Sequence, residues 1–156
     1  MKALDDLPRS IDDTYTLILE RTEMNNIDER SYQLMIRILR WLVGASRPMK
    51  LGKLAEAIPI EPGQKFLNLD TVVNEPERMV EVCGSLVRKD PDTSEIFLAH
   101  YSIKEFLTSD RILRHEDGRI DVRRYHLDLA VTNEILARSC LNYYNLRALL
   151  SGLIAP

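Results

Sequence analysis

Apolar side chains recur every three or four residues over the first third of the chain, which is the spacing of one buried face of an α-helix. The stretch 11–22 shows this spacing at Ile11, Tyr15, Ile18 and Leu19. In the stretch 28–43, apolar residues cover most of the helix surface. Its polar positions form one narrow stripe: Arg30, Gln33, Arg37, Arg40 and Gly44. A helix with so little polar surface needs neighbours on several sides, so we expect this second helix at the centre of the fold.

A short extended piece, 47–51, and a third helix, 51–58, come next. Pro48 disfavours helical backbone at the residue before it, which favours the extended conformation. Pro59 and the Pro62-Gly63 pair then end the third helix. We expect Phe66 and Leu67 to anchor the loop that follows.

Two β-prone runs, 86–89 and 95–99, flank a turn-rich segment, which predicts a β-hairpin. A fourth helix, 74–83, precedes the hairpin, with Asn74 as its expected cap. A fifth helix follows the hairpin, and we expect the Ser102 hydroxyl to cap it. Asp128 can cap a last helix, which carries apolar residues from Leu136 onward.

Helix, short extended piece, two helices and a β-hairpin, in this order, are the layout of a winged helix. The sequence therefore predicts a mainly α fold with a small β-hairpin: a winged helix plus flanking N- and C-terminal helices. We expect an N-terminal linker helix over 1–26, the winged-helix core over 27–100 and a C-terminal helical extension over 101–156. Winged helices bind DNA, bind proteins or act as rigid spacers, so this fold does not give the function.

The charge balance argues against a non-specific nucleic-acid binder, because 21 Lys and Arg against 24 Asp and Glu leave a net charge of −3. In DNA-binding winged helices, the helix before the hairpin enters the major groove. Here that stretch carries Glu75, Glu77 and Glu81 against Arg78 alone. Acidic residues there oppose the counterion release that drives DNA affinity. A nucleic-acid partner is therefore not expected, and DNA binding stays the alternative.

The sharpest charge asymmetry lies between Arg30 and Ala55, where six basic residues and no acidic residue occur. Three interpretations stay open: the solvated face of a buried helix, a docking surface for an acidic partner, or a nucleic-acid contact. The hairpin is a second docking candidate. The predicted partner-docking residues are Arg30, Arg37, Arg40, Arg47, Lys50, Lys53, Arg88 and Lys89.

Patterns typical of catalysis or metal binding are absent from the sequence. There is no phosphate-binding loop and no Gly-x-Ser-x-Gly nucleophile motif, and the three histidines lack zinc-site spacing. Cys83 with His100 could be imagined as a nucleophile and its base. The apolar neighbours of Cys83 indicate a buried thiol instead, as do those of Cys140. We therefore expect no enzymatic activity, no cofactor and no metal.

Membrane and export signals are also missing. No run of about 18 apolar residues occurs, and the first ten residues carry charges where a signal peptide needs an apolar stretch. The prediction is a cytoplasmic chain with no membrane contact.

Several runs of residues together resemble one family. They are Leu7-Pro8-Arg9-Ser10-Ile11-Asp12-Asp13-Thr14-Tyr15, Leu39-Arg40-Trp41-Leu42, Arg47-Pro48-Met49, Leu54-Ala55-Glu56-Ala57-Ile58, Cys83-Gly84-Ser85-Leu86-Val87, Leu98-Ala99-His100-Tyr101-Ser102-Ile103-Lys104-Glu105-Phe106-Leu107 and Cys140-Leu141-Asn142-Tyr143. In this order they are similar to the winged-helix segment that follows the NACHT nucleotide-binding module in fungal NACHT and ankyrin-repeat proteins. The same domain is also labelled after a GPI inositol-deacylase, a label that implies no deacylase activity in this segment.

The resemblance implies a piece of an NLR-like, STAND-type signal-transduction ATPase. In such a receptor the winged helix would be a non-enzymatic regulatory and coupling module. Its partners would be the nucleotide-binding module and the repeat domain of the same parent protein. In some relatives a winged-helix histidine reaches the nucleotide phosphate, and whether His100 corresponds to it stays open.

Overall fold

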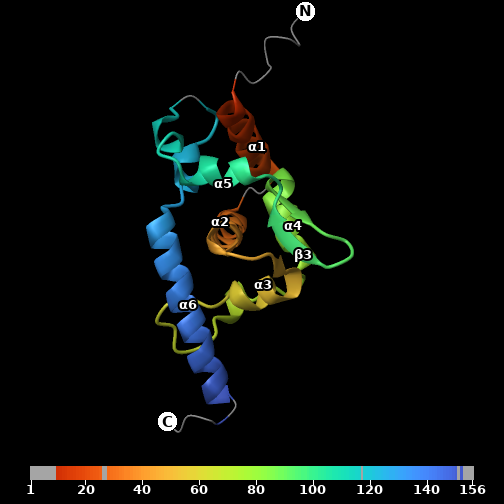
Figure 1. Cartoon of the computed structure of the whole chain (residues 1–156), viewed down its shortest axis with the longest axis vertical. Coiled ribbons are helices and arrows are strands. Elements are labelled where there is room, and N and C mark those ends of the chain that lie inside the picture. The colour runs from red at the N-terminus through yellow and green to blue at the C-terminus, as the bar shows by residue number, and fades with distance from the viewer. Residues whose placement is uncertain (1–9, 26–27, 117, 151, 153–156) are drawn as a thin grey trace, which may run out of the picture.

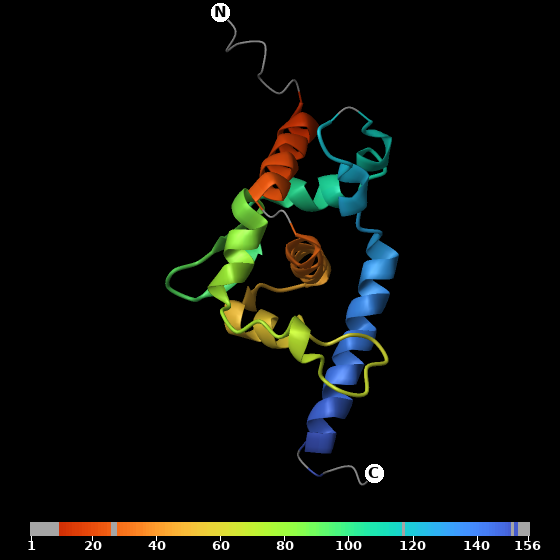
Figure 2. The same cartoon turned by 180° about the vertical axis from the view of Figure 1, so that it is seen from behind.

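The computed structural model describes residues 10–25, 28–116, 118–150 and 152, and at its centre lies helix α2 (Glu29–Gly44). Other elements surround this helix on several sides (Figures 1 and 2). Met35, Ile38, Leu39 and Val43 are almost completely buried. The central position expected from the sequence is confirmed. Of the polar stripe, Arg30 and Gln33 are exposed, whereas the other three positions are half-buried.

The winged-helix order follows α2 along the chain. Strand β1 (Met49–Lys50), α3 (Leu51–Ala57) and α4 (Glu77–Cys83) precede the hairpin of β2 (Val87–Lys89) and β3 (Glu95–Leu98). The hairpin is confirmed, and β1 adds a third strand to it. The sheet order is β1-β3-β2, antiparallel throughout, with Met49 opposite Ile96 and Val87 opposite Leu98.

Three helices flank the winged helix. Helices α1 (Ile11–Asn25) and α5 (Tyr101–Thr108) lie together at one end, and α6 (Leu129–Leu150) runs along one side (Figure 1). Short 3-10 turns occur at Leu69–Thr71, Gly84–Leu86, Ile112–Arg114 and Val122–Tyr125. The predicted fold class, mainly α with flanking helices, is confirmed.

One buried cluster joins α1, α2, α3, α4, α5 and the two hairpin strands. Leu19 of α1, Phe106 of α5 and Tyr125 of the turn Val122–Tyr125 belong to the same cluster as the α2 side chains. The rings of Tyr15 and Phe106 lie 5.5 Å apart, which joins α1 to α5. The division into 1–26, 27–100 and 101–156 stays a prediction. Residues of all three ranges belong to the same buried cluster.

Several local expectations are wrong. Phe66 and Leu67 do not anchor their loop, because both side chains are exposed, Phe66 by 83%. Asn74 does not cap α4, since Pro76 holds the cap position without a side-chain hydrogen bond. Ile11, at the end of α1, is exposed rather than buried. These residues are exposed, so packing against the core does not fix the conformations that the local sequence pattern predicts.

Candidate functional site

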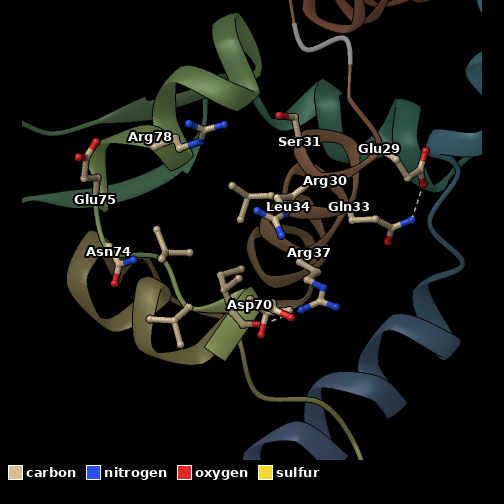
Figure 3. Close-up of a pocket in the computed structure, with 14 residues that line it drawn as sticks. Glu29, Arg30, Ser31, Gln33, Leu34, Arg37, Asp70, Asn74, Glu75 and Arg78 are labelled. Carbon is tan, nitrogen blue, oxygen red and sulfur yellow. Dashed lines mark hydrogen bonds between the residues drawn. The ribbon is translucent and has the colours of Figure 1, made fainter. Parts of the chain in front are cut away.

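A groove of 610 Å³ lies between α2 and the segment that leads into α4 (Figure 3). Leu34, Ile58, Val72 and Val73 give it an apolar floor. Its rim is charged, with Arg30 and Arg37 contributed by α2 and Arg78 by α4. Figure 3 shows Arg78 extending from α4 toward α2, where Arg30 lies.

The three arginines of the groove differ in their partners. Arg37 forms an ion pair with Glu61 and donates to the Ile58 carbonyl oxygen at 3.5 Å. Arg30 and Arg78 are exposed and form no ion pair with any residue that the structure describes. Their charges lower the pKa of Asp28, after the larger effect of hydrogen bonds from Ser31. Two cationic side chains therefore remain available for a partner.

The acidic residues of the groove are Glu29, Asp70 and Glu75. Glu29 is already engaged, because Gln33 donates to it at 2.9 Å and Arg124 at 3.1 Å. These hydrogen bonds, that of Gln33 first, lower the pKa of Glu29 and keep it ionised. Asp70 and Glu75 lie on the opposite rim, so the groove offers a mixed pattern of charge over an apolar floor.

The other predicted docking residues do not line this groove. Arg40 is half-buried in a smaller pocket beside α6, and burial lowers its pKa. Lys53 pairs with Glu56 at 3.2 Å, and Arg47 and Lys50 are exposed near β1. The six basic residues of the stretch 30–55 thus point to several surfaces and form no single patch.

The hairpin brings Lys89 next to α4, where it meets an acidic residue. Lys89 pairs with Glu77, and Arg88 is exposed on the same strand. On α4 itself Glu77 and Glu81 are exposed beside Arg78. The helix that would enter a DNA major groove therefore presents more negative than positive charge, as its sequence indicates.

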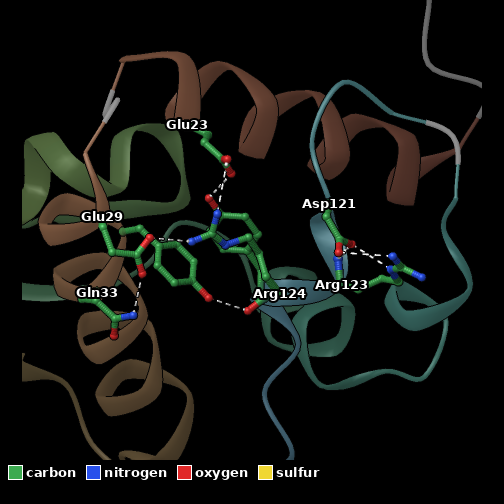
Figure 4. Close-up of polar contacts among 8 residues, drawn as sticks. Glu23, Glu29, Gln33, Asp121, Arg123 and Arg124 are labelled. Atoms are coloured by element: carbon green, nitrogen blue, oxygen red, sulfur yellow. Dashed lines mark hydrogen bonds and ion pairs between the residues drawn. The ribbon is translucent and has the colours of Figure 1, made fainter.

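A polar cluster that the sequence did not reveal joins α1, α2 and the turn Val122–Tyr125 (Figure 4). The Arg124 guanidinium lies 3.5 Å from the centre of the Tyr32 ring and pairs with Glu23 and Glu29. The Tyr32 hydroxyl donates to the Arg124 carbonyl oxygen at 2.8 Å, and Tyr125 donates to Glu23 at 2.6 Å. No local sequence motif predicts this cluster, because its members are far apart in the sequence and only the fold brings them together.

Ser102, His100 and Tyr15 form a hydrogen-bonded series that resembles part of a hydrolase site. The His100 Nδ1 accepts the Ser102 backbone N–H at 3.2 Å, so His100 and not Ser102 is the cap of α5. Because Nδ1 is an acceptor, the Ser102 hydroxyl donates to it at 2.6 Å, and Tyr15 donates to the Ser102 oxygen. The hydroxyl is buried and bound on both sides, which fits a role in joining α1 to α5.

The two cysteines have opposite environments. Cys83 is fully buried, and burial raises the pKa of its thiol. Such a thiol stays protonated and is not available as a nucleophile. Cys140 is exposed on α6, so the expectation that both thiols are buried is wrong for Cys140.

Within the described part of the chain, no three His, Cys, Asp or Glu side chains are placed to share a metal ion. None of the described helices combines the length and apolar character that crossing a bilayer requires.

The order of helices and strands and the three-stranded sheet define a winged-helix domain. The chain belongs to the family described as "GPI inositol-deacylase, winged helix domain", whose model matches residues 22–119. It is also similar to the "Azaphilone pigments biosynthesis cluster protein L" of Monascus ruber, with 26% identity over 158 residues. The alignment covers 97% of this chain and 31% of that relative, so the chain spans about a third of its length. No solved structure matches the chain.

Proposed function

We propose that this winged helix is a non-enzymatic regulatory and coupling module of a cytoplasmic, NLR-like signal-transduction ATPase. In that role it makes protein contacts between a nucleotide-binding module and a repeat sensor. The observation that carries the proposal is the groove beside α2, which combines an apolar floor with Arg30 and Arg78, two arginines that form no ion pair with a described residue. Membership of the family supports the winged-helix domain, and the receptor context of the proposal comes from the resemblance described above.

The charge on α4 favours a protein partner over DNA. A duplex would meet the exposed Glu77 and Glu81, and Lys89 is already paired with Glu77. Each of these carboxylates opposes the approach of phosphates. A protein partner can instead place carboxylates against Arg30 and Arg78, and an apolar side chain over Leu34.

Of the docking residues expected from the sequence, Arg30 is the one we assign to the contact, with Arg78 added. Arg37 holds the groove wall through Glu61 and the Ile58 carbonyl. We propose that Arg40, Arg47, Lys50, Lys53, Arg88 and Lys89 lie outside this contact, because none lines the groove.

The test compares two double charge reversals in the 156-residue chain. Arg30→Glu with Arg78→Glu changes the groove, and Lys104→Glu with Arg114→Glu makes the same change in net charge at exposed positions elsewhere. Titration calorimetry against a separately produced NACHT module of the same receptor class should show at least tenfold weaker binding for the groove variant alone. Equal affinity of the two variants, or no binding by the unmodified chain, would contradict the proposal.

The DNA alternative is tested by the anisotropy of a labelled duplex at low and moderate salt. We expect no binding that depends on salt. Micromolar binding that weakens steeply with salt, and that the groove variant loses, would replace the coupling role with DNA recognition and place its footprint at Arg30 and Arg78.

A further inference from the structure

A second groove, of 370 Å³, lies where the C-terminal half of α6 passes α3 and the end of α2. Its walls are apolar and aromatic, with Trp41, Met49 and Ile60 on one side and Tyr143 and Tyr144 of α6 on the other. Tryptophan and tyrosine are the side chains that most often dominate the energy of protein interfaces. The aromatic lining of this groove is therefore typical of a protein-binding site.

The charged rim of this second groove is mainly basic. Lys53 and Arg147 line it together with one acidic residue, Glu56. Glu56 is paired with Lys53 at 3.2 Å, whereas Arg147 has no ion pair among the described residues. The net charge of the rim is positive, and Arg147 is free to meet a carboxylate.

The groove continues onto an exposed apolar stripe of α6. Ala137, Leu141 and Tyr144 follow one another at helical spacing and are exposed, Leu141 by 66% and Tyr144 by 69%. Leu136 and Ser139, on the opposite side of α6, are buried against the rest of the molecule. Figures 1 and 2 show this half of α6 extending past α3.

We propose that this surface binds an amphipathic helix of a protein partner. Apolar residues at helical spacing would pack along Leu141 and Tyr144, and one large apolar side chain would enter the groove beside Trp41. Acidic residues flanking that apolar face would pair with Arg147 and Lys53. The proposal goes beyond the coupling role, because it concerns a different surface. It would hold whether the first groove binds a protein or DNA.

The basic rim also argues against a second copy of this chain as the occupant. A symmetric pair would bring the same patch of each copy together, Arg147 and Lys53 included. Like charges facing each other in this way oppose association. The charge thus selects a partner with acidic flanks.

The test is a selection from a displayed library of helical peptides on the whole 156-residue chain. The library has a fixed leucine and phenylalanine stripe and glutamate, glutamine or lysine at each flanking position. We expect glutamate to be enriched at least tenfold over lysine. The selected peptide, made without tryptophan, should change the fluorescence of Trp41, which is the single tryptophan of the chain.

Variants of exposed residues decide whether the peptide uses this surface. Leu141→Ser with Tyr144→Ser should weaken binding at least tenfold, while Val131→Ser, also exposed on α6, should leave it unchanged. Circular dichroism checks that all three chains are folded. The proposal is overturned by equal enrichment of lysine, by binding that survives Leu141→Ser with Tyr144→Ser, or by a dimer in sedimentation that this pair abolishes.

Discussion

Tyr125 shows how much a single buried hydroxyl can contribute to this fold. Its ring is completely buried, and its hydroxyl reaches the carboxylate of Glu23 on α1 at 2.6 Å. Burial, together with this hydrogen bond, raises the pKa of Tyr125 well above its ordinary value. The side chain therefore holds α1 against the turn Val122–Tyr125 through both packing and a charged hydrogen bond.

Replacing Tyr125 by Phe should keep the packing and remove the hydrogen bond. We expect the free energy of unfolding to fall by about 1.5 kcal/mol, the usual contribution of a hydrogen bond to a charged group. Urea unfolding measures the change. Tyr101→Phe, at an exposed tyrosine, should change stability by less than about 0.5 kcal/mol, and a similar loss in both variants would contradict this assignment.

The raised pKa of Tyr125 also predicts a pH dependence. Above about pH 10 the unfolded chain releases the phenol proton, while the folded chain retains it, so stability falls as the pH rises. Below that pH the contribution is fully present. Urea midpoints between pH 8 and 11 should therefore fall more steeply for the unmodified chain than for Tyr125→Phe. Parallel curves would show that Tyr125 ionises equally in both states.

The two thiols should differ sharply in reactivity. Burial raises the pKa of Cys83, and the thiolate is the reactive form, so iodoacetamide near neutral pH should modify Cys140 and spare Cys83 in the folded chain. In urea both should react. Mass spectrometry of the intact protein counts the additions, and two rapid additions to the folded chain would contradict the burial of Cys83.

Residue-level expectations from sequence succeed where the interaction is local. Asp128 does accept the Val131 backbone N–H at 2.9 Å at the start of α6, as predicted. The sequence predicts Ser102 as the cap of α5, because hydroxyl residues are common caps. In the structure, His100 has extended backbone and holds the cap position, where its ring nitrogen accepts the Ser102 backbone N–H.

At the scale of elements, helix ends depend on backbone conformation as much as on side chains. Gly84 ends α4 with a φ of +53°, as its position after the helix predicted. A Cβ there would lie 3.3 Å from the Thr22 Oγ1. Gly52, within α3, has no such constraint, because a Cβ there would meet nothing within 4 Å.

These two glycines should respond to alanine in opposite directions. Gly84→Ala forces a side chain into left-handed backbone and should destabilise the chain by about 1 to 3 kcal/mol. Gly52→Ala should stabilise it by about 0.5 to 1 kcal/mol, because alanine is the better helix former. Thermal unfolding of the two variants gives the comparison, and a shift of the same sign in both would contradict the structural account.

Most helices and strands are predictable from hydrophobic spacing, but the strand with which β1 pairs is not. The helical ranges and the hairpin follow from periodicity and turn residues, which act over short distances along the chain. Strand β1 was visible as an extended piece, yet its pairing with β3 joins distant parts of the sequence. The grooves share this property, since each is assembled from three or more separate segments.

At the scale of the molecule, the flanking helices α1 and α5 belong to the same buried cluster as the winged helix. Removing them would expose the partners of Leu19, Phe106 and Tyr125. Each large buried side chain contributes about 1.5 to 3 kcal/mol, and a whole domain is stable by only about 5 to 15 kcal/mol. The winged-helix segment thus depends on what precedes and follows it.

A fragment of residues 28–100 should therefore fail to unfold cooperatively. A fragment of residues 10–150, which retains every buried side chain of the described structure, serves as the control and should unfold like the whole chain. Circular dichroism during heating compares them. A sharp transition for 28–100 near that of the control would show that the winged helix folds without its flanks.

The position of β1 also bears on the order in which the fold forms. Strands β2 and β3 are joined by a short turn, whereas the pairing of Met49 with Ile96 closes a loop that contains α3 and α4. Closing that long loop costs more entropy than closing the hairpin. We therefore expect β3 to keep one unpaired edge during folding until β1 docks on it.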